Sequence, residues 1–284
     1  MLFNSRSLKK KTVGVTEFLK SRNCDVCFVT EAWIKMNDKV TIAEVQRLGY
    51  LVCLKPRKGR RGGGVCALYK DSLDLKKCKL DTVYKTFELL EVVIKSQYGL
   101  VRVSTIYRTG QMSVQARSEF VNELDDYLLS LTQKKGEKIL CGDLNIHVEN
   151  LVPETHDLYA ITESYGFSQL VKGPTHKDGG TLDLVFLQQH SPYCSMANDS
   201  LLVHDIAFSV TSDHQFIEFD IPFTKDEVVP KQINLTYRDY NCVNADLFCN
   251  DVINLLTTEY NDFFTLDVDS AADALNKALF MTIE

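Results

Sequence analysis

The sequence contains no apolar run long enough to cross a membrane. Among its 284 residues, no stretch approaches the roughly 18 consecutive apolar side chains that a membrane-spanning helix needs. The first residues, Met1-Leu2-Phe3-Asn4, also lack the long apolar core of a secretory signal. The nine cysteines are an odd number without regular spacing, which is typical of reduced thiols. We therefore expect no membrane partner and a nuclear or cytoplasmic location.

Three partial motifs lack the residue that would complete them. Cys24 and Cys27 have no second cysteine pair at zinc-finger spacing. The segment that starts at Asp267 resembles a calcium loop, but it has Ala272 where the loop requires glycine. The glycines at 62–64 are not followed by the Gly-Lys-Ser/Thr ending of a nucleotide-binding loop. The sequence therefore gives no support for a zinc finger, an EF-hand or a P-loop.

The net charge of −6 conceals a basic N-terminal quarter. Residues 1–70 carry 15 Lys and Arg against 5 Asp and Glu, whereas the remainder carries 17 against 33. Basic side chains such as Arg60, Arg61 and the lysines at 9–11 could follow a phosphate backbone. A solvated basic face explains the same charges equally well, so charge alone leaves both interpretations open.

Hydrophobic periodicity predicts alternating strands and helices. Short apolar or alternating runs predict strands at 24–30, 65–69, 88–95, 100–107, 138–141, 182–187, 206–210 and 215–221. Apolar residues at helical spacing predict helices at 8–19, 120–131 and 157–165. Many strands with intervening helices are typical of an α/β sandwich, in which sheets lie inside and helices outside.

The composition divides the chain into three parts. Residues 1–222 contain the alternating elements and are predicted to form one large domain. Residues 223–243 are charged and contain Pro230, which is typical of a linker. Residues 244–284 are predicted to form an acidic helical extension, with helices at 244–256 and 270–280.

Polar side chains lie at the ends of several predicted strands. Asp143 and Asn145 are two residues apart, a spacing that places both side chains on one side of an extended backbone. A carboxylate such as Asp183 beside the imidazole of His214 would fix the tautomer and favour the protonated form. Glu31 closes another strand, where α/β active sites gather. The set fits metal-assisted phosphoester hydrolysis, which needs carboxylates for a hard cation, a group that orients water, and an imidazole.

Each of these residues also has a plain structural interpretation. A single Glu31 after a strand is more often a surface acid, and Asp143 with Asn145 could form an Asx turn. Tyr107, at a strand end, would usually serve packing. The remaining histidines, which we interpret as structural, are His147, His156, His176, His190 and His204.

Eight short segments occur in the order in which one family has them. They are Asn4-Ser5-Arg6-Ser7-Leu8, Thr30-Glu31-Ala32-Trp33, Arg61-Gly62-Gly63-Gly64-Val65, Ile106-Tyr107-Arg108, Gly142-Asp143-Leu144-Asn145, Pro174-Thr175-His176, Leu182-Asp183-Leu184-Val185-Phe186 and Ser212-Asp213-His214. The chain resembles the endonuclease domain of non-LTR (LINE-type) retrotransposons, closest to the chicken-repeat-like group, within the endonuclease/exonuclease/phosphatase superfamily. The resemblance spans roughly residues 2–222 and implies a four-layered α/β sandwich with its site at one edge of two packed sheets.

The resemblance implies a role for each matching residue. Glu31 would be the principal ligand of Mg²⁺, for which Mn²⁺ could substitute. Asn4 and Asp213 would assist it, although the short start of the chain leads us to expect a loosely held Asn4. The implied catalytic residues are Asp143 for the attacking water, Asn145 for positioning, Asp183 to orient His214, His214 for the phosphorane and Tyr107 for a phosphate oxygen. The implied phosphate- and DNA-binding residues are Thr175, Ser212, Arg6, Arg108, Arg60 and Arg61.

The implied reaction is hydrolysis of one strand of duplex DNA to a 3′-hydroxyl and a 5′-phosphate. In an intact element the hydroxyl would prime reverse transcription of the element's RNA. Residues 237–240 and the helix after them resemble the connector that precedes the reverse transcriptase, which suggests a fragment or a gene derived from an element. Two alternatives stay open: a superfamily phosphatase or abasic-site endonuclease, and a catalytically dead binding protein.

Overall fold

The structure, a computed structural model, describes residues 1–57, 59–96, 99–110, 113–150, 152–205, 210, 212–221, 244–260 and 262–283. These residues belong to two units, Met1–Val228 and Val229–Glu284, which are described separately. The predicted linker at 223–243 lies outside the described residues, and so does the predicted strand at 206–210 except for Val210.

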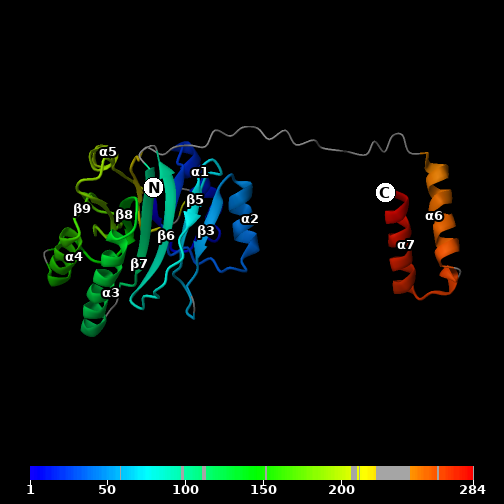
Figure 1. The fold of residues 1–284 in the computed structure, drawn as a ribbon, viewed down its shortest axis with the longest axis horizontal. Coiled ribbons are helices and arrows are strands. Elements are labelled where there is room, and N and C mark those ends of the chain that lie inside the picture. Colours follow the sequence, from blue (N-terminus) through cyan, green and yellow to red (C-terminus); the bar gives the residue numbers. More distant parts are fainter. Residues whose placement is uncertain are drawn as a thin grey trace. The chain divides into compact units, whose positions relative to one another are not determined.

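Two six-stranded sheets form the centre of the first unit (Figure 1). The first sheet has the order β11-β12-β1-β2-β4-β3, in which β1 and β2 are parallel and the other neighbours are antiparallel. Its strands are β1 (Leu2–Asn4), β2 (Val26–Thr30), β3 (Leu51–Lys55), β4 (Val65–Tyr69), β11 (Leu202–His204) and β12 (Phe216–Glu218).

The second sheet has the order β5-β6-β7-β8-β10-β9. Here β7 and β8 are parallel, and the other neighbours are antiparallel. Its strands are β5 (Leu75–Lys77), β6 (Phe87–Ser96), β7 (Gly99–Arg108), β8 (Glu137–Asp143), β9 (Phe167–Gln169) and β10 (Asp183–Gln188). Both sheets are therefore mixed, each with one parallel pair among antiparallel neighbours.

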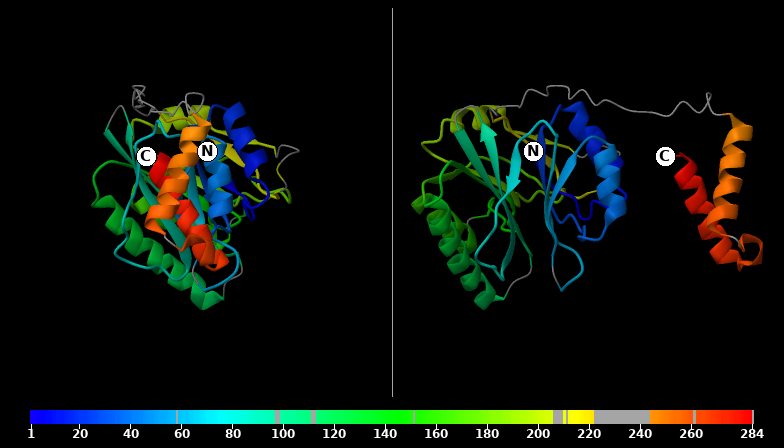
Figure 2. Two further views of the ribbon diagram at one scale, coloured as in Figure 1. Left: turned by 90° about the vertical axis from the view of Figure 1, so that its right-hand side faces the viewer. Right: turned by 45° about the vertical axis from the view of Figure 1, so that its right-hand side comes forward.

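Helices cover the outer face of each sheet (Figure 2). Helices α1 (Thr12–Ser21) and α2 (Lys39–Arg47) pack on the first sheet. Helices α3 (Val114–Thr132) and α4 (Pro153–Ser164) pack on the second, and the short α5 (Cys194–Ser200) follows β10. The predicted four-layered α/β sandwich is confirmed.

The side-chain alternation of β2 shows why the chain folds into layers. Val26 and Phe28 lie in the apolar layer between the sheets, whereas Cys27 and Val29 lie in the layer beneath α1 and α2. A strand that is apolar on both faces must be covered on both faces, because successive side chains point in opposite directions. The continuous apolar run of this segment thus requires a second sheet on one side and helices on the other.

The predicted apolar face of the helix at 120–131 is buried throughout. Its five members, Phe120, Leu124, Tyr127, Leu128 and Leu131, are at most 2% exposed. The helix begins earlier than the apolar pattern, because the side chain of Ser113 accepts a hydrogen bond of 3.2 Å from the amide of Ala116 and so caps the N-terminus.

The first helix begins later than its pattern predicts. Leu8 is buried, but α1 starts at Thr12 because Lys10 adopts a left-handed backbone with φ of 64°. The residues before the helix are fixed to the loop after β2 instead. The amide of Leu8 donates to the carbonyl of Ala32 over 3.0 Å. The segment that contains Asn4 is thereby held against the segment that contains Glu31.

The second unit is a pair of helices packed side by side. They are α6 (Ala245–Glu259) and α7 (Val268–Ile283), joined through the 3-10 turn η2 (Phe263–Thr265). Their contact is a small apolar core of Val252, Leu256, Ala274 and Ala278. Both helices were predicted from the sequence, at 244–256 and 270–280. Within the described residues, no helix has the length and apolarity that a membrane crossing requires.

Candidate active site

The strand topology brings the predicted site residues to one edge of the two sheets. Parallel strands end at the same edge, so Asn4 lies beside Thr30 in the first sheet and Tyr107 beside Asp143 in the second. Strand β10 is antiparallel to β8, so its first residue, Asp183, pairs with Asp143. Residues at the ends of five strands, β1, β2, β7, β8 and β10, therefore lie at one edge of each sheet.

Asn4 lies at the centre of this arrangement. Its Nδ2 donates hydrogen bonds to Oε1 of Glu31 over 3.2 Å and to Oδ2 of Asp143 over 2.7 Å. Its Oδ1 accepts from the amide of Arg6 over 3.0 Å, and its carbonyl accepts from the hydroxyl of Ser212 over 2.8 Å. Asn4 is fully buried, so the expectation of a loosely held Asn4 is wrong. Because β1 pairs with β2 on one side and with β12 on the other, a strand of three residues is enough to hold Asn4 in place.

The loop that carries Glu31 is held in an uncommon backbone conformation. Glu31 and Trp33 have φ of 49° and 55°, a region that side chains other than glycine rarely adopt. The indole Nε1 of Trp33 donates to Oε2 of Glu31 over 3.1 Å. The amide of Trp33 donates to the carbonyl of Gly63 over 2.8 Å. The glycine-rich segment thus supports the proposed metal ligand.

Asp143 is buried and fully hydrogen-bonded. Its Oδ1 accepts from the amide of Asn145 over 2.9 Å, and its Oδ2 accepts from Nδ2 of Asn145 over 3.1 Å as well as from Asn4. The Asx turn is therefore present. The two side chains meet through this turn and not on an extended backbone as predicted, because β8 ends at Asp143 and Asn145 has φ of 48°. Burial, and next the adjacent Asp183 carboxylate, raise the pKa of Asp143 well above its ordinary value.

Asp183 and His214 form a buried pair. Oδ2 of Asp183 lies 2.7 Å from Nδ1 of His214. Burial alone would lower the pKa of His214, but the charge of Asp183 and its hydrogen bond outweigh it and raise the pKa to about 9. The imidazole is therefore cationic at neutral pH, with Nδ1 engaged and Nε2 left for a ligand.

Tyr107 faces Glu31 beneath an arginine. The guanidinium of Arg57 lies 5.3 Å from the centre of the Tyr107 ring. Burial, followed by the carboxylates of Glu31 and Asp143, raises the pKa of the Tyr107 phenol. The phenol therefore stays protonated and can donate a hydrogen bond. Arg57 is itself paired with Glu88.

Arg108 is predicted to contact DNA, but the structure places its side chain inside the protein. Arg108 is 1% exposed; its Nη1 donates to the carbonyls of Leu144 and Asn145 over 2.9 and 3.1 Å, and its Nη2 pairs with Glu154 over 2.9 Å. The prediction that Arg108 contacts DNA is therefore wrong, because its guanidinium is used to hold the loop after β8.

Thr175 is likewise fully buried. Its hydroxyl accepts hydrogen bonds of 3.0 Å from the amides of Leu182 and Asp183, so it fixes the start of β10 rather than a phosphate. Ser212 accepts from the amide of His214 over 3.3 Å while donating to Asn4, and so supports its loop. Both hydroxyls act on the positions of other site residues.

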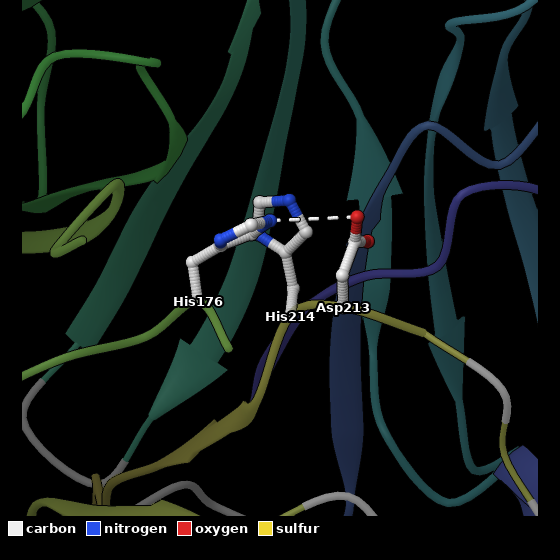
Figure 3. Close-up of side chains that lie close together, drawn as sticks. All are labelled: His176, Asp213 and His214. Atoms are coloured by element: carbon white, nitrogen blue, oxygen red, sulfur yellow. Dashed lines mark ion pairs between the residues drawn. The ribbon is translucent and has the colours of Figure 1, made fainter. Parts of the chain in front are cut away.

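Asp213 is placed between two basic groups. Its Oδ2 pairs with Arg6 and lies 3.4 Å from Nε2 of His176 (Figure 3). His176, which we interpret as structural from the sequence, stands edge-on to His214 with ring centres 4.8 Å apart. Its place in the segment Pro174-Thr175-His176 was the signal for a role at the site. Arg60 and Arg61 are exposed, as a DNA contact would require.

The carboxylate oxygens of the site suit a hard divalent cation. Ligand atoms of Asp143, Asp183 and His214 lie within 4.8 Å of one another, and Glu31 is connected to them through Asn4. Oδ1 of Asp183 is buried without a hydrogen-bond partner in the described part of the chain. Several buried carboxylates around one imidazolium leave negative charge that a cation would offset. The residues present therefore fit the Mg²⁺ that the resemblance implies.

Paired mixed sheets with a carboxylate, amide and imidazole site at one edge define a class of hydrolytic nucleases and phosphatases. The chain belongs to the endonuclease/exonuclease/phosphatase family, whose model matches residues 1–214. No curated protein sequence matches the chain.

Solved structures share the fold at low sequence identity. The endonuclease domain of TRAS1, a telomere-specific non-LTR retrotransposon, is 16% identical with a TM-score of 0.60, and the match covers 79% of this chain and 97% of that one. An AP endonuclease from Archaeoglobus fulgidus is 18% identical with a TM-score of 0.58, over 78% and 98%. The Neisseria 3′ phosphatase NExo, bound to a product DNA hairpin, is 17% identical with a TM-score of 0.58, over 78% and 98%.

Proposed function

We propose that this protein is a Mg²⁺-dependent endonuclease that nicks one strand of duplex DNA and leaves a 3′-hydroxyl and a 5′-phosphate. The observation that carries the proposal is the single amide of Asn4, which joins Glu31 to Asp143 beside the Asp183–His214 pair. Metal ligand, water-binding carboxylate and imidazolium are thereby held within one hydrogen-bonded group. Hydrolysis of a phosphoester needs these three functions together.

Asp143 and Asn145 are the residues that would hold the attacking water. Both oxygens of Asp143 are already directed by hydrogen bonds, so the carboxylate cannot rotate away from its orientation. A raised pKa makes this carboxylate a stronger base than an exposed aspartate. Asp143 would orient the water and accept its proton, and the amide of Asn145 would keep the carboxylate in place.

His214 and Tyr107 would stabilise charge on the phosphoryl oxygens. Asp183 keeps His214 protonated, so Nε2 can donate a hydrogen bond where negative charge develops. The protonated phenol of Tyr107 would donate from the other sheet. Glu31, with Asp213 nearby, would hold Mg²⁺ or Mn²⁺, and Nδ2 of Asn4 would orient the Glu31 carboxylate for it. When bound, the cation supplies Lewis-acid polarisation of the phosphoryl group.

A basic groove beside Tyr107 supports duplex DNA as the substrate. Its basic lining residues come from both sheets and include Lys55, Arg57, Arg60 and Lys77. Lysine and arginine side chains along a groove would follow a phosphate backbone without reading sequence. The AP endonuclease and the DNA-bound NExo, both similar in fold, also favour a DNA substrate.

We further propose that the nick serves a retrotransposon-type reaction, in which the new 3′-hydroxyl primes reverse transcription of the element's RNA. The eight ordered motifs and the fold shared with the TRAS1 domain support this origin. In that setting the partners would be element RNA and a reverse transcriptase in a longer parent protein.

The test is a nicking assay on supercoiled plasmid with Mg²⁺, in which wild type is compared with His214→Ala. Removing one preorganised electrostatic group costs about 10²–10³ in rate. The nicked ends should prime a DNA polymerase, which identifies a 3′-hydroxyl. An abasic oligonucleotide cleaved far faster than intact plasmid would instead favour the abasic-site alternative. Circular dichroism confirms that both proteins are folded, and no nicking by folded wild type would overturn the proposal.

A further inference from the structure

His176, Asp213 and His214 form a group whose composition differs from the rest of the site. Their ligand atoms all lie within 4.8 Å of one another (Figure 3). His176 and His214 pair as an isolated antiparallel β-bridge, which fixes both backbones relative to each other. The group therefore joins two loops, and its geometry does not depend on the rotamers of long side chains.

Asp183 determines which ring nitrogen of His214 is available to this group. Nδ1 of His214 is engaged by the buried carboxylate over 2.7 Å, so Nε2 is the nitrogen available for a ligand. A carboxylate behind an imidazole is the arrangement that orients histidine ligands in zinc sites and raises their basicity. The fold therefore already holds one histidine together with the carboxylate that would orient it as a zinc ligand.

Asp213 offers an oxygen that its other contacts leave free. Arg6 and His176 both face Oδ2, whereas Oδ1 is buried without a hydrogen-bond partner within the described residues. A buried, unpartnered carboxylate oxygen is costly unless a cation or donor reaches it. Since the side chains of Asp213 and His176 are still 11% and 16% exposed, an ion could reach the group from solvent.

The donor set selects the class of ion. Two imidazoles with one carboxylate suit Zn²⁺ and similar transition metals, whereas Mg²⁺ prefers an all-oxygen set. Nε2 of His176 lies 3.4 Å from Oδ2 of Asp213, so the imidazole and the carboxylate that carries the free Oδ1 are close enough to share one ion with bonds of about 2.0–2.1 Å. A water would complete the fourth position.

We propose that His176, Asp213 and His214 form a Zn²⁺ site, and that Zn²⁺ bound there inhibits the endonuclease. The inhibitory half rests on the proposed function, because Zn²⁺ would release the proton of His214 Nε2 to solvent and bind that nitrogen, which must otherwise donate the same proton to the phosphoryl oxygen. Zn²⁺ would also draw Asp213 away from Arg6. The binding half stands on the geometry alone. Asp213 belongs to both sites, and His176 distinguishes the Zn²⁺ site from that of Mg²⁺, whose principal ligand is Glu31.

Co²⁺ is the probe for binding, because its spectrum reports both geometry and ligand type. Titration of the full chain, reduced and free of metal, should give one equivalent of strongly absorbing, four-coordinate Co²⁺ that Zn²⁺ displaces. The chain has nine cysteines, so a thiolate charge-transfer band in the near ultraviolet must be absent. His176→Gln should weaken binding at least tenfold. The matched control His156→Gln, an exposed histidine on α4, should bind as wild type does.

The inference fails if His176→Gln binds Co²⁺ as tightly as wild type, or if the spectrum shows weak octahedral or thiolate-bound Co²⁺. Thermal melts identify a variant that does not fold, in which case His176→Asn replaces it. In the nicking assay, Zn²⁺ added to the Mg²⁺ reaction should inhibit wild type at concentrations that leave His176→Gln active, and equal inhibition of both would overturn the regulatory role. If the wild type binds Co²⁺ but never nicks DNA, the proposed endonuclease function is contradicted and the proposed metal site is retained.

Discussion

At the scale of single residues, Asn4 shows how much of the site depends on one amide. A single Nδ2 reaches the carboxylates of Glu31 and Asp143, which belong to different sheets. Two carboxylates near each other repel, and a donor shared between them offsets that repulsion. The amide therefore positions both the proposed metal ligand and the proposed base.

Replacement of Asn4 by alanine should reduce nicking by about 10²–10³. The change removes the donor that fixes Glu31 and leaves Asp143 held by Asn145 alone. Initial rates on supercoiled plasmid measure the effect, and Asn150→Ala, an exposed asparagine on the loop after β8, is the matched control. Equal rates for Asn4→Ala and wild type would contradict the assigned place of Asn4.

Arg108 should matter for stability and not for DNA affinity. Arg108→Ala would leave two backbone carbonyls without their buried donor, and we expect a loss of about 3 kcal/mol in the free energy of unfolding. Arg117→Ala is the control, because Arg117 also pairs with Glu154 over 3.0 Å but is half exposed, and it should cost under about 1 kcal/mol. Urea denaturation measures the free energy of unfolding of both variants. An equal loss in the two variants would contradict the structural role of Arg108.

The sequence predicted residue types at the site better than it predicted their contacts. Carboxylates and an imidazole at strand ends were sufficient to select Asp143, Asp183 and His214. No pattern along the sequence distinguishes a buried arginine such as Arg108 from an exposed one, because its carbonyl and carboxylate partners lie 36 residues or more away in the chain. His176 was missed for the same reason, since its partners come from a loop 37 residues away in the chain.

At the scale of elements, the approach of β7 to β8 requires glycine at the end of β8. A Cβ added to Gly142 would lie 1.8 Å from the carbonyl oxygen of Ile106, and its φ of 145° is itself unfavourable for other residues. This close approach explains why the glycine immediately precedes Asp143. The same contact fixes the position of Asp143 on β8 relative to Tyr107 on β7.

Gly142→Ala should therefore destabilise the fold by about 4 kcal/mol or more, because the β7–β8 pairing must open to admit the methyl group. Gly166→Ala is the control. Gly166 also has a positive φ, of 74°, but its Cβ would meet nothing within 4 Å, so only the backbone cost of about 1–2 kcal/mol applies. Thermal or urea denaturation compares them, and equal effects would show that the close approach is unimportant.

Glu91 on β6 joins three elements in one buried ionic network. It accepts hydrogen bonds from Arg102 on β7, Tyr127 on α3 and Lys134 just after α3, over 2.6, 2.9 and 3.0 Å. Burial alone would raise the pKa of Glu91, but the bonds from Lys134 and Tyr127 outweigh it and hold the pKa below its ordinary 4.5. The network ties α3 to the sheet through charge as well as apolar contact.

The stability that this network provides should vanish in acid. Because the folded-state pKa of Glu91 is lower than the unfolded one, its contribution is complete above pH 4.5 and is lost as pH falls through the folded pKa. The difference in unfolding free energy between wild type and Glu91→Gln should be large at pH 7 and shrink below about pH 4. Glu119→Gln, which alters an exposed glutamate, should show no such trend. A difference that is independent of pH would contradict this account.

Elements were predictable where their own residues carry the pattern. The long strands β6 and β7 and the helix α3 each have a periodic apolar face that identifies them. Strands β5, β9 and β11 have three residues each and were missed. So short a segment is a strand because its neighbour offers hydrogen bonds, and that information lies elsewhere in the sequence.

At the scale of the whole molecule, opposite charges are separated along the chain. The basic excess of residues 1–70 includes Arg60 and Arg61, which are exposed, and Arg60 lines the groove beside Tyr107. If these side chains meet DNA phosphates, binding releases condensed counterions and weakens with salt.

The double substitution Arg60→Ala with Arg61→Ala should lower the salt dependence of DNA affinity, reducing the slope of log K against log salt by about 1.8. Fluorescence anisotropy with a labelled duplex at several salt concentrations measures this slope. Substituting Lys135 and Lys138, which belong to the opposite end of the β7–β8 pair, provides the control and should leave the slope unchanged. An unchanged slope in the arginine variant would remove both residues from the DNA contact.

Strand β1 lies between β2 and β12, so the third residue of the chain and the two hundred and seventeenth belong to the same sheet. Strand β1 therefore cannot be paired on both sides until the chain has been synthesised through residue 217. His214, which the proposed reaction needs, is also made only shortly before that point. Under the proposed function, we expect nicking activity only from chains that extend past residue 217.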